Sequence, residues 1–250
     1  MKYSIIGHVA IVHLTGEVSR EAIERILENP RVKTVIGRIG SFGEKRIIRS
    51  VLLAGEPKTI TEHKELSTRF ILDAARITFS PGNHAERKRL IEIVEDGENI
   101  LDMFAAVGNL SMPVAKHRRV NVIGIEICGY TYNFLLKTIE RNKLSNYTAV
   151  LGDSRRSSPI RRADRVFLGF FELDEMHIKA ALRALRGIGY LHIHLLARKG
   201  REEERIEEFL ERHKIEPLDY TRRVVKSYSP AYNHIVVDVK VKSSAASQGV

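Results

Sequence analysis

The sequence predicts an α/β protein, with a mostly parallel sheet that ends in an antiparallel hairpin and a small α+β domain that precedes it. Between residues 99 and 195, short apolar runs alternate with segments of helical spacing, which is typical of a parallel sheet with crossover helices. Near the carboxyl end a short turn joins two strand-like runs, which favours an antiparallel hairpin. The first 65 residues lack this alternation. We therefore expect an N-terminal domain over 1–65 and a larger domain over 66–250.

The N-terminal block contains one expected helix between expected strands. Residues 9–14 are apolar and are predicted to form a strand. Ser19 is a candidate N-cap, because the apolar residues that follow it recur at helical spacing. Pro30 lies just beyond the end of this helix, and residues 32–39 are predicted to form a second strand. The basic stretch 44–62 is expected to add one or two more strands.

The larger block is predicted to supply the strands of the main sheet. Helical stretches separate its strand-like apolar runs, which cover residues 99–103, 120–126, 148–151, 165–170 and 188–195. A further amphipathic helix carries Ile206, Phe209 and Leu210 on one face. It precedes the two final strands, over 218–226 and 235–241, in which apolar and polar residues alternate toward the end of the chain.

Composition limits the classes of protein that the chain can represent. Hydrophobic residues make up 43% of it and charged residues 29%, which is globular rather than disordered. No apolar run is long enough to span a bilayer, and the first residues lack the pattern of a signal peptide. The single cysteine, Cys128, excludes an internal disulfide and a multi-cysteine metal site. We expect a soluble, cytoplasmic protein, and its net charge of +10 favours a polyanionic partner.

A small-residue turn follows the first strand of the larger block. Asp102-Met103-Phe104-Ala105 ends that strand, and Gly108 lies in the turn before a helix with Pro113 in its first turn. Small residues let a ligand approach the backbone closely, and open sheets bind ligands at the carboxyl ends of their strands. The turn has only one glycine, so the three-glycine pattern of dinucleotide-binding proteins is absent.

Acidic residues end the next two strands. Glu126 can accept hydrogen bonds from both hydroxyl groups of a ribose, and Asp153 can reach an adenine amino group. The alternatives are a solvated loop acid at Glu126 and a helix-capping or turn residue at Asp153. Together the three segments describe an adenosine site without a phosphate cradle. S-adenosylmethionine (AdoMet) fits such a site, since it has an adenosine and a cationic sulfonium but no phosphate.

Several segments resemble archaeal enzymes that modify the tRNA anticodon loop and have the Rossmann-like class I methyltransferase fold. The resemblance lies in residues 79–87, 102–105 with Gly108, 125–126, 163–166 and 228–230, and it extends from about residue 66 to 241. Two sister groups share these marks. One methylates the guanosine 3′ of the anticodon. The other moves the 3-amino-3-carboxypropyl group of AdoMet onto a tricyclic base that is made from this guanosine in phenylalanine tRNA, during wybutosine synthesis.

The segment after the fourth strand distinguishes the two groups. Leu168-Gly169-Phe170-Phe171 is similar to the hydrophobic-Gly-aromatic pattern of the aminocarboxypropyltransferases, whereas the methyltransferases carry Asn-Leu-Pro or Asn-Pro-Pro there. His192-Ile193-His194 resembles the His-Tyr-His of the same group. The resemblance therefore implies an AdoMet-dependent tRNA aminocarboxypropyltransferase that needs no metal, and we favour a monomer. A methyltransferase acting on the same base, and a tRNA-binding protein without catalysis, are the alternatives.

The resemblance and the strand-end pattern together give the expected site. The residues predicted to bind AdoMet are Ser80, Arg87, Asp102, Phe104, Ala105, Gly108, Glu126, Asp153, Ser154 and Gly169. Arg87 is expected to fix the methionine arm or its carboxylate, unless it is a surface arginine of a helix. Phe170 is expected to stack on the acceptor base, unless it belongs to the core.

Some features of the expected site stay open. His192 and His194 lie two residues apart and face the same side of a strand, either at the ligand end of the sheet or as structural histidines. We assign no general base and no protein nucleophile. Gly82 stands where many relatives have arginine, and Ala106 where they have a second glycine. The first departure puts one substrate or cofactor contact in doubt.

Overall fold

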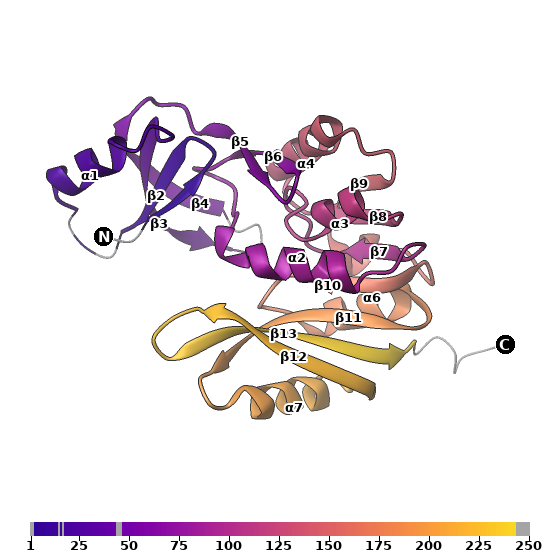
Figure 1. Ribbon diagram of the computed structural model, residues 1–250. Helices are drawn as coiled ribbons and strands as arrows, with labels where there is room; N and C mark the ends of the chain where they lie inside the picture. Colours follow the sequence, from indigo (N-terminus) through magenta and orange to yellow (C-terminus); the bar gives the residue numbers. More distant parts are fainter. Residues whose placement is uncertain (1–2, 15, 17, 44–46, 244–250) are drawn as a thin grey trace.

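The computed structural model describes residues 3–14, 16, 18–43 and 47–243, and its main body is a seven-stranded sheet (Figure 1). The strand order is β12-β13-β11-β10-β7-β8-β9. The strands are β7 (Asn99–Asp102), β8 (Asn121–Glu126), β9 (Tyr147–Leu151), β10 (Ala163–Leu168), β11 (Leu185–Arg198), β12 (Pro217–Ser227) and β13 (Tyr232–Lys242). Pairing is parallel from β11 through β9 and antiparallel in β11–β13 and β13–β12. This confirms the predicted fold class.

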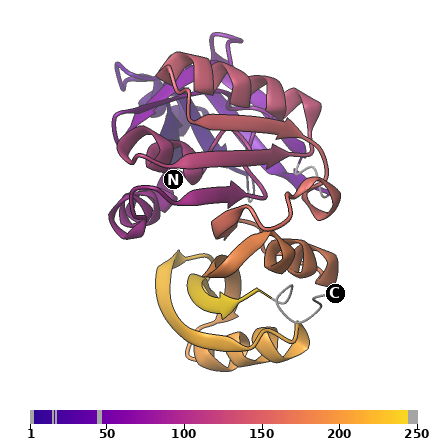
Figure 2. The same ribbon diagram turned by 90° about the vertical axis from the view of Figure 1, so that its right-hand side faces the viewer.

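Helices cover both faces of this sheet because alternate strand residues bury their side chains on opposite faces. On one face, α2 (His84–Ile93), α3 (Ser111–His117) and α4 (Gly129–Asn142) pack in the same apolar cluster as Ile100 and Phe167. On the other face, α6 (Glu175–Ala184) and α7 (Glu202–Arg212) pack with Leu101 and Val166. Figure 2 shows the parallel strands one above another, with the carboxyl-terminal hairpin curving beneath them.

The N-terminal residues form a separate sheet of order β1-β2-β3-β4. Its elements are β1 (Tyr3–Ile6), β2 (Val9–His13), α1 (Arg20–Leu27), β3 (Thr34–Phe42) and β4 (Ile47–Gly55). The Ser19 side chain accepts a hydrogen bond from the Ala22 amide, so the predicted cap of α1 is confirmed. The part of the predicted strand region that covers residues 44–46 lies outside the described residues.

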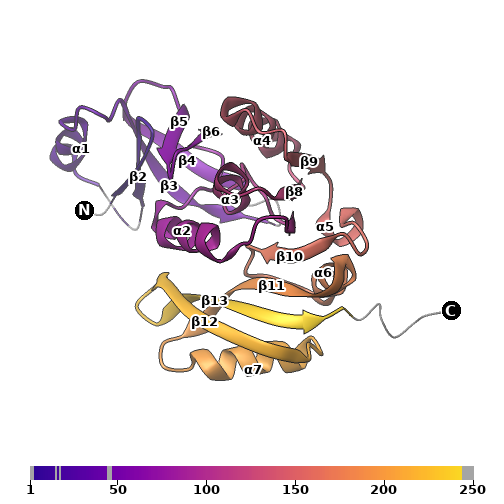
Figure 3. The same ribbon diagram turned by 45° about the vertical axis from the view of Figure 1, so that its right-hand side comes forward.

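A hairpin of β5 (Ile60–Glu65) and β6 (Thr68–Asp73) connects the two sheets. Phe70 and Leu72 of β6 lie in one apolar cluster with residues of the N-terminal sheet, of α2 and of the main sheet. The predicted domain boundary between residues 65 and 66 falls in the turn of this hairpin. The division into two domains therefore stays a prediction. Helix α2 follows the short 3-10 helix η1 (Pro81–Asn83) and lies between the N-terminal sheet and the β12–β13 hairpin (Figures 1 and 3).

The described residues include no helix that is long and apolar enough to cross a membrane.

Candidate functional site

A cavity of about 870 Å³ opens at the carboxyl ends of the parallel strands. This is the edge at which open α/β sheets bind ligands. Its walls come from the loops that follow β7, β8, β9 and β10, from residues 76–78, and from the first turns of α4 and α6. Six of the predicted site residues line it: Phe104, Glu126, Asp153, Ser154, Gly169 and Phe170. The other predicted residues do not, namely Ser80, Arg87, Asp102, Ala105, Gly108, His192 and His194.

Glu126 ends β8 and joins two loops of the cavity wall. Its Oε2 accepts a hydrogen bond from the Ala106 amide at 2.9 Å, and its Oε1 accepts one from the Cys128 amide at 2.7 Å. Each oxygen keeps a further lone pair, and the side chain reaches the cavity. Burial raises the pKa of the Glu126 carboxyl. The carboxylate can therefore bind ribose hydroxyls while it holds the loops in place.

The turn after β7 has the backbone that its small residues allow. Gly108 has φ +84°, and a Cβ there would lie 2.8 Å from Met112 Cβ. Both facts require glycine at this position, and they let α3 pack closely against the turn. Ala106 has φ +49°, in a region that glycine prefers, so alanine adds some strain where many relatives have glycine. Gly108 thus shapes the cavity wall without lining it.

Asp102 lies beneath the same turn. Its carboxylate accepts hydrogen bonds from Ser111 Oγ at 2.6 Å and from the Phe104 amide at 3.2 Å, and Ser111 Oγ also lies 2.8 Å from the Tyr147 hydroxyl. Complete burial raises the pKa of Asp102 to about 6. Asp102 therefore sits in a buried polar network directly under a wall of the cavity.

Asp153 is a helix-capping residue that also lines the cavity. It caps the short helix α5 (Ser154–Ser157) by accepting a hydrogen bond from the Arg155 amide, and it pairs with the Arg155 side chain at 2.8 Å. This pairing lowers the pKa of the Asp153 carboxyl, so the group is anionic where it lines the cavity.

An aromatic group forms another wall of the cavity. The rings of Phe104 and Phe170 stack at 5.1 Å between centroids, and the His177 ring lies 5.2 Å from that of Phe104. His177 lines the cavity from the first turn of α6, where it forms a capping box with Asp174. The sequence analysis missed His177, together with Arg76 and Asn109, which also line the cavity. The capping pattern from Asp174 to His177 indicates a helix start but not a binding site.

Arg87 is buried rather than exposed, so the alternative of a surface arginine is wrong. Its guanidinium pairs with Glu65, at 2.5 Å from Nε to Oε1 and 2.8 Å from Nη2 to Oε2, and it donates to the Ser80 carbonyl at 3.0 Å. These contacts tie α2 to the β5–β6 hairpin. Contact of Ser80 and Arg87 with the cofactor stays a prediction.

Lys226 of β12 reaches the segment before α2. Its Nζ donates to Ser80 Oγ at 2.6 Å and to Asn83 Oδ1 at 2.8 Å. A Cβ on Gly82 would lie 3.2 Å from Lys226 Cδ, so the lysine fills the space beside this glycine. Burial lowers the pKa of Lys226. The amino group of Lys226 therefore lies next to Gly82, at the position where many relatives have arginine.

A second cavity, of about 900 Å³, shares one lining residue with the first, Phe170, whose side chain is buried at 8% exposure. Phe171, Tyr228 and Arg205 contribute to its wall. The rings of Phe171 and Tyr228 meet edge to face at 5.8 Å between centroids. Phe170 is thus part of the wall of two spaces, one at the strand ends and one beside the carboxyl-terminal hairpin.

Known proteins resemble this chain in sequence and in fold. Residues 61–220 match the family described as the TRM5/TYW2 methyltransferase domain, and the chain belongs to this family. It is 33% identical to the tRNA(Phe) (4-demethylwyosine(37)-C(7)) aminocarboxypropyltransferase of Methanocaldococcus jannaschii, over 96% of this chain and 98% of that protein. It is 29% identical to the tRNA (guanine(37)-N(1))-methyltransferase Trm5b of Pyrococcus abyssi, over 96% of this chain and 74% of that protein.

The solved structures agree with these relatives. The fold matches a crystal structure of M. jannaschii TYW2 in complex with AdoMet with a TM-score of 0.75 and 29% identity, covering 97% of this chain and all of that chain. The family indicated by the sequence motifs and the class I methyltransferase fold that it implied are both confirmed.

Proposed function

We propose that the chain is a tRNA-modifying transferase that moves the 3-amino-3-carboxypropyl group of AdoMet to a tricyclic guanosine derivative. This base lies 3′ of the anticodon in phenylalanine tRNA. The observation that carries the proposal is the end-to-end match to an aminocarboxypropyltransferase of this specificity, at 33% identity. The character of the cavity supports it, because Gly169 and Phe170 line the wall after β10 and offer no amide group to a guanine edge.

The first cavity suits AdoMet, which is the group donor. Glu126 is placed to accept hydrogen bonds from the ribose hydroxyls, and the anionic Asp153 to accept one from the adenine amino group. Phe104 offers an apolar ring to the donor. Contacts by these residues fix the orientation of the donor, and orientation decides the reaction, since all three carbons on the sulfonium are activated by the same charge.

Aminocarboxypropyl transfer requires the γ-carbon of the methionine arm to face the acceptor. A carbon of the acceptor base attacks this γ-carbon, and the bond between the γ-carbon and sulfur breaks. The bonding electrons return to sulfur, which leaves as the neutral thioether of methylthioadenosine, and the acceptor carbon loses its proton. The chain supplies positioning. The released proton passes to solvent.

The second cavity suits the acceptor base. Phe170 lines both cavities, so a base held beside it in the second lies close to a donor in the first. The rings of Phe171 and Tyr228 offer edges and faces to a tricyclic base, and aromatic side chains commonly hold unstacked bases in RNA recognition. Arg205 lines this cavity and can meet RNA phosphates. A tRNA substrate also supports the expected cytoplasmic location.

Nucleoside analysis tests the proposal. The protein and AdoMet are incubated with phenylalanine tRNA that carries either the tricyclic base or an unmodified guanosine, and the digested nucleosides are analysed by mass spectrometry. We expect the mass of an aminocarboxypropyl group on the tricyclic base and no product from guanosine. A methylated nucleoside supports the methyltransferase alternative, to which the similarity to Trm5b gives some weight. Binding of tRNA without any product supports a non-catalytic protein.

A further inference from the structure

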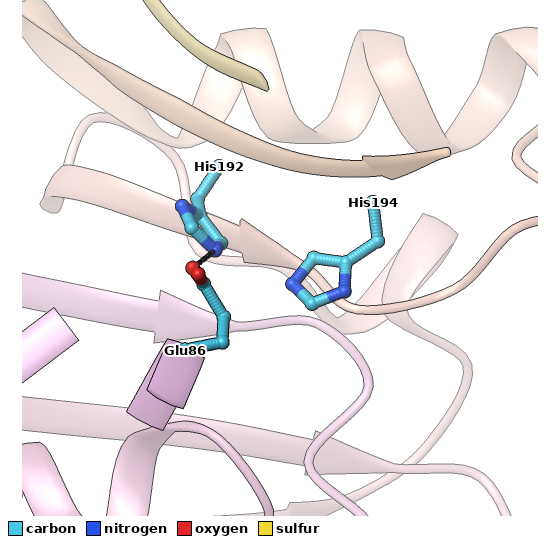
Figure 4. Close-up of side chains that lie close together, drawn as sticks. All are labelled: Glu86, His192 and His194. Atoms are coloured by element: carbon cyan, nitrogen blue, oxygen red, sulfur yellow. Dashed lines mark ion pairs between the residues drawn. The ribbon is translucent and has the colours of Figure 1, made fainter. Parts of the chain in front are cut away.

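Glu86, His192 and His194 form a buried cluster that lines neither cavity (Figure 4). Glu86 comes from α2 and the two histidines from β11, and their exposed fractions are 1%, 0% and 2%. One candidate ligand atom from each residue lies within 4.8 Å of the others. Two segments that are distant in the sequence thus bring a carboxylate oxygen and two imidazole nitrogens together inside the protein.

Both histidines of this cluster have an Nε2 atom that lacks a hydrogen-bond partner among the described residues. His192 Nε2 lies 3.0 Å from Glu86 Oε1, but the contact lacks the angles of a hydrogen bond. Figure 4 shows Nε2 of His194 facing Glu86 and His192. Buried polar atoms are nearly always satisfied, so two such atoms at one place point to a missing partner.

The other ring nitrogens are held by neighbouring side chains. His192 Nδ1 contacts Asp238 Oδ1 of β13 very closely, and His194 Nδ1 lies 2.8 Å from His234 Nε2. Arg89 Nη2 lies 3.3 Å from His192 Nδ1, a longer contact than that with Asp238, so the Nδ1 proton points to the carboxylate. Metal-binding histidines typically donate their second N–H in this way, which leaves the Nε2 lone pair free for the metal.

The charges of the cluster leave it short of one positive charge. Glu86 and Asp238 are two carboxylates, and Arg89 pairs with both, at 2.8 Å and 2.5 Å. If both histidines are neutral, the group has a net charge of −1, which is costly to bury. A proton on His192 would supply the charge but would leave Nε2 of His194 unsatisfied. A divalent metal ion would change the net charge from −1 to +1, and unlike the proton it would satisfy both Nε2 atoms.

We propose that Glu86, His192 and His194 bind a divalent transition-metal ion of the zinc type. Imidazole and carboxylate ligands suit Zn²⁺ and its neighbours in the first transition row, whereas Mg²⁺ and Ca²⁺ prefer oxygen ligands. Because the ligands are buried and line neither cavity, the ion serves to fasten α2 to β11. The proposal does not depend on the proposed function. It revises the expectation from the sequence that no metal is needed.

Metal content and metal-dependent stability test the proposal. The full chain is purified without a histidine tag, refolded with either Zn²⁺, Co²⁺ or a chelator, and freed of unbound ions. We expect about one ion per chain, a higher melting temperature than in the chelated sample, and visible absorption from Co²⁺ in a histidine–carboxylate site. Absence of a bound ion, together with equal melting temperatures, would overturn the proposal and place the positive charge on His192.

Two variants separate the site from adventitious binding. His194→Gln removes one ligand, and we expect it to lower the affinity for Co²⁺ by at least about tenfold and to abolish the metal-dependent rise in melting temperature. His213→Gln is the matched control, because His213 also has a buried unpartnered ring nitrogen but lies outside the cluster. Equal metal binding by His194→Gln and the wild type would contradict the proposal. If His194→Gln does not fold, the wild-type comparison decides.

Discussion

Glu126 is the residue on which AdoMet binding should depend most directly. Its carboxylate faces the cavity and accepts two backbone hydrogen bonds. The loss of a charged hydrogen bond costs about 1.5–3 kcal/mol, so we expect Glu126→Ala to weaken AdoMet binding roughly tenfold or more. Calorimetry measures this affinity, and circular dichroism checks the fold. Glu126→Gln keeps one acceptor oxygen, so its affinity for AdoMet should lie between those of the wild type and Glu126→Ala. Unchanged affinity in Glu126→Ala would remove Glu126 from the binding site.

The negative charge of Asp102 should lower the stability of the protein and strengthen its binding of AdoMet. Its pKa is raised by burial to about 6 from an ordinary value of 3.8. The folded state therefore holds the proton more tightly than the unfolded state, and the wild type loses stability as pH rises from about 4 to about 6. We expect Asp102→Asn to melt at a higher temperature than the wild type at pH 7.5, with a smaller difference at pH 4.

The same substitution should weaken AdoMet binding at pH 7.5, because it removes a negative charge beneath the wall that faces a cationic ligand. Melting curves at both pH values and a titration with AdoMet check the two effects. A difference in melting temperature that is the same at pH 4 and pH 7.5 would show that the Asp102 carboxyl has an ordinary pKa.

The residues of the cavity were predictable where they directly follow a strand. Glu126, Asp153 and Gly169 each come at or just after the end of a parallel strand, and such ends meet at one edge of the sheet. His177 and Arg76 reach the cavity through the packing of α6 and of the segment before η1. No local pattern encodes that packing, which explains why the sequence analysis missed them.

At the scale of elements, the Glu65–Arg87 pair should stabilise the junction between the β5–β6 hairpin and α2. The Glu65 side chain is 8% exposed and that of Arg87 1% exposed. Removal of one partner from such a buried pair typically costs about 3–5 kcal/mol. We expect Glu65→Gln to lower the melting temperature by several degrees at pH 7. Glu24→Gln is the control, since the Arg20–Glu24 pair is largely exposed and contributes little.

The effect at Glu65 should depend on pH. Burial by itself raises the pKa of Glu65, but the contacts of this carboxylate with His63 and Arg87 outweigh it and lower the pKa to about 2. A carboxyl with a lowered pKa in the folded state adds stability above its ordinary pKa, and this stability is lost as pH falls from about 4.5 toward 2. The wild type and Glu65→Gln should therefore converge in melting temperature in this range. A constant difference between pH 7 and pH 3 would contradict the ion pair.

Elements with a clear apolar period were predictable, and those without one were missed. The strands of the main sheet and the carboxyl-terminal hairpin appear close to their predicted ranges. Helix α2 was missed because it buries Glu86 and Arg87 beside Leu90, so its inward face does not look apolar in the sequence. Strand β6 was missed too, because its partner β5 is rich in charged residues and the hairpin has no strong turn signal.

At the scale of the whole molecule, the net charge of +10 should govern RNA affinity. Lysine and arginine contacts to phosphates release counterions, so affinity falls with salt in proportion to the number of contacts. We expect the affinity for phenylalanine tRNA to fall at least roughly tenfold between about 50 and 200 mM salt. Affinity for AdoMet serves as the internal control, because this ligand releases no counterions. A flat response for tRNA would place the excess of basic residues away from the RNA.

The central claim is that the donor presents its γ-carbon, and not its methyl group, to the acceptor. Transfer of label from two batches of AdoMet tests this most directly, one labelled in the methyl group and one in the carboxyl carbon. Each is incubated with the protein and phenylalanine tRNA that carries the tricyclic base, and the label in precipitated RNA is counted. We predict that carboxyl label enters the RNA and methyl label does not. Methyl label in the RNA without carboxyl label would contradict the account.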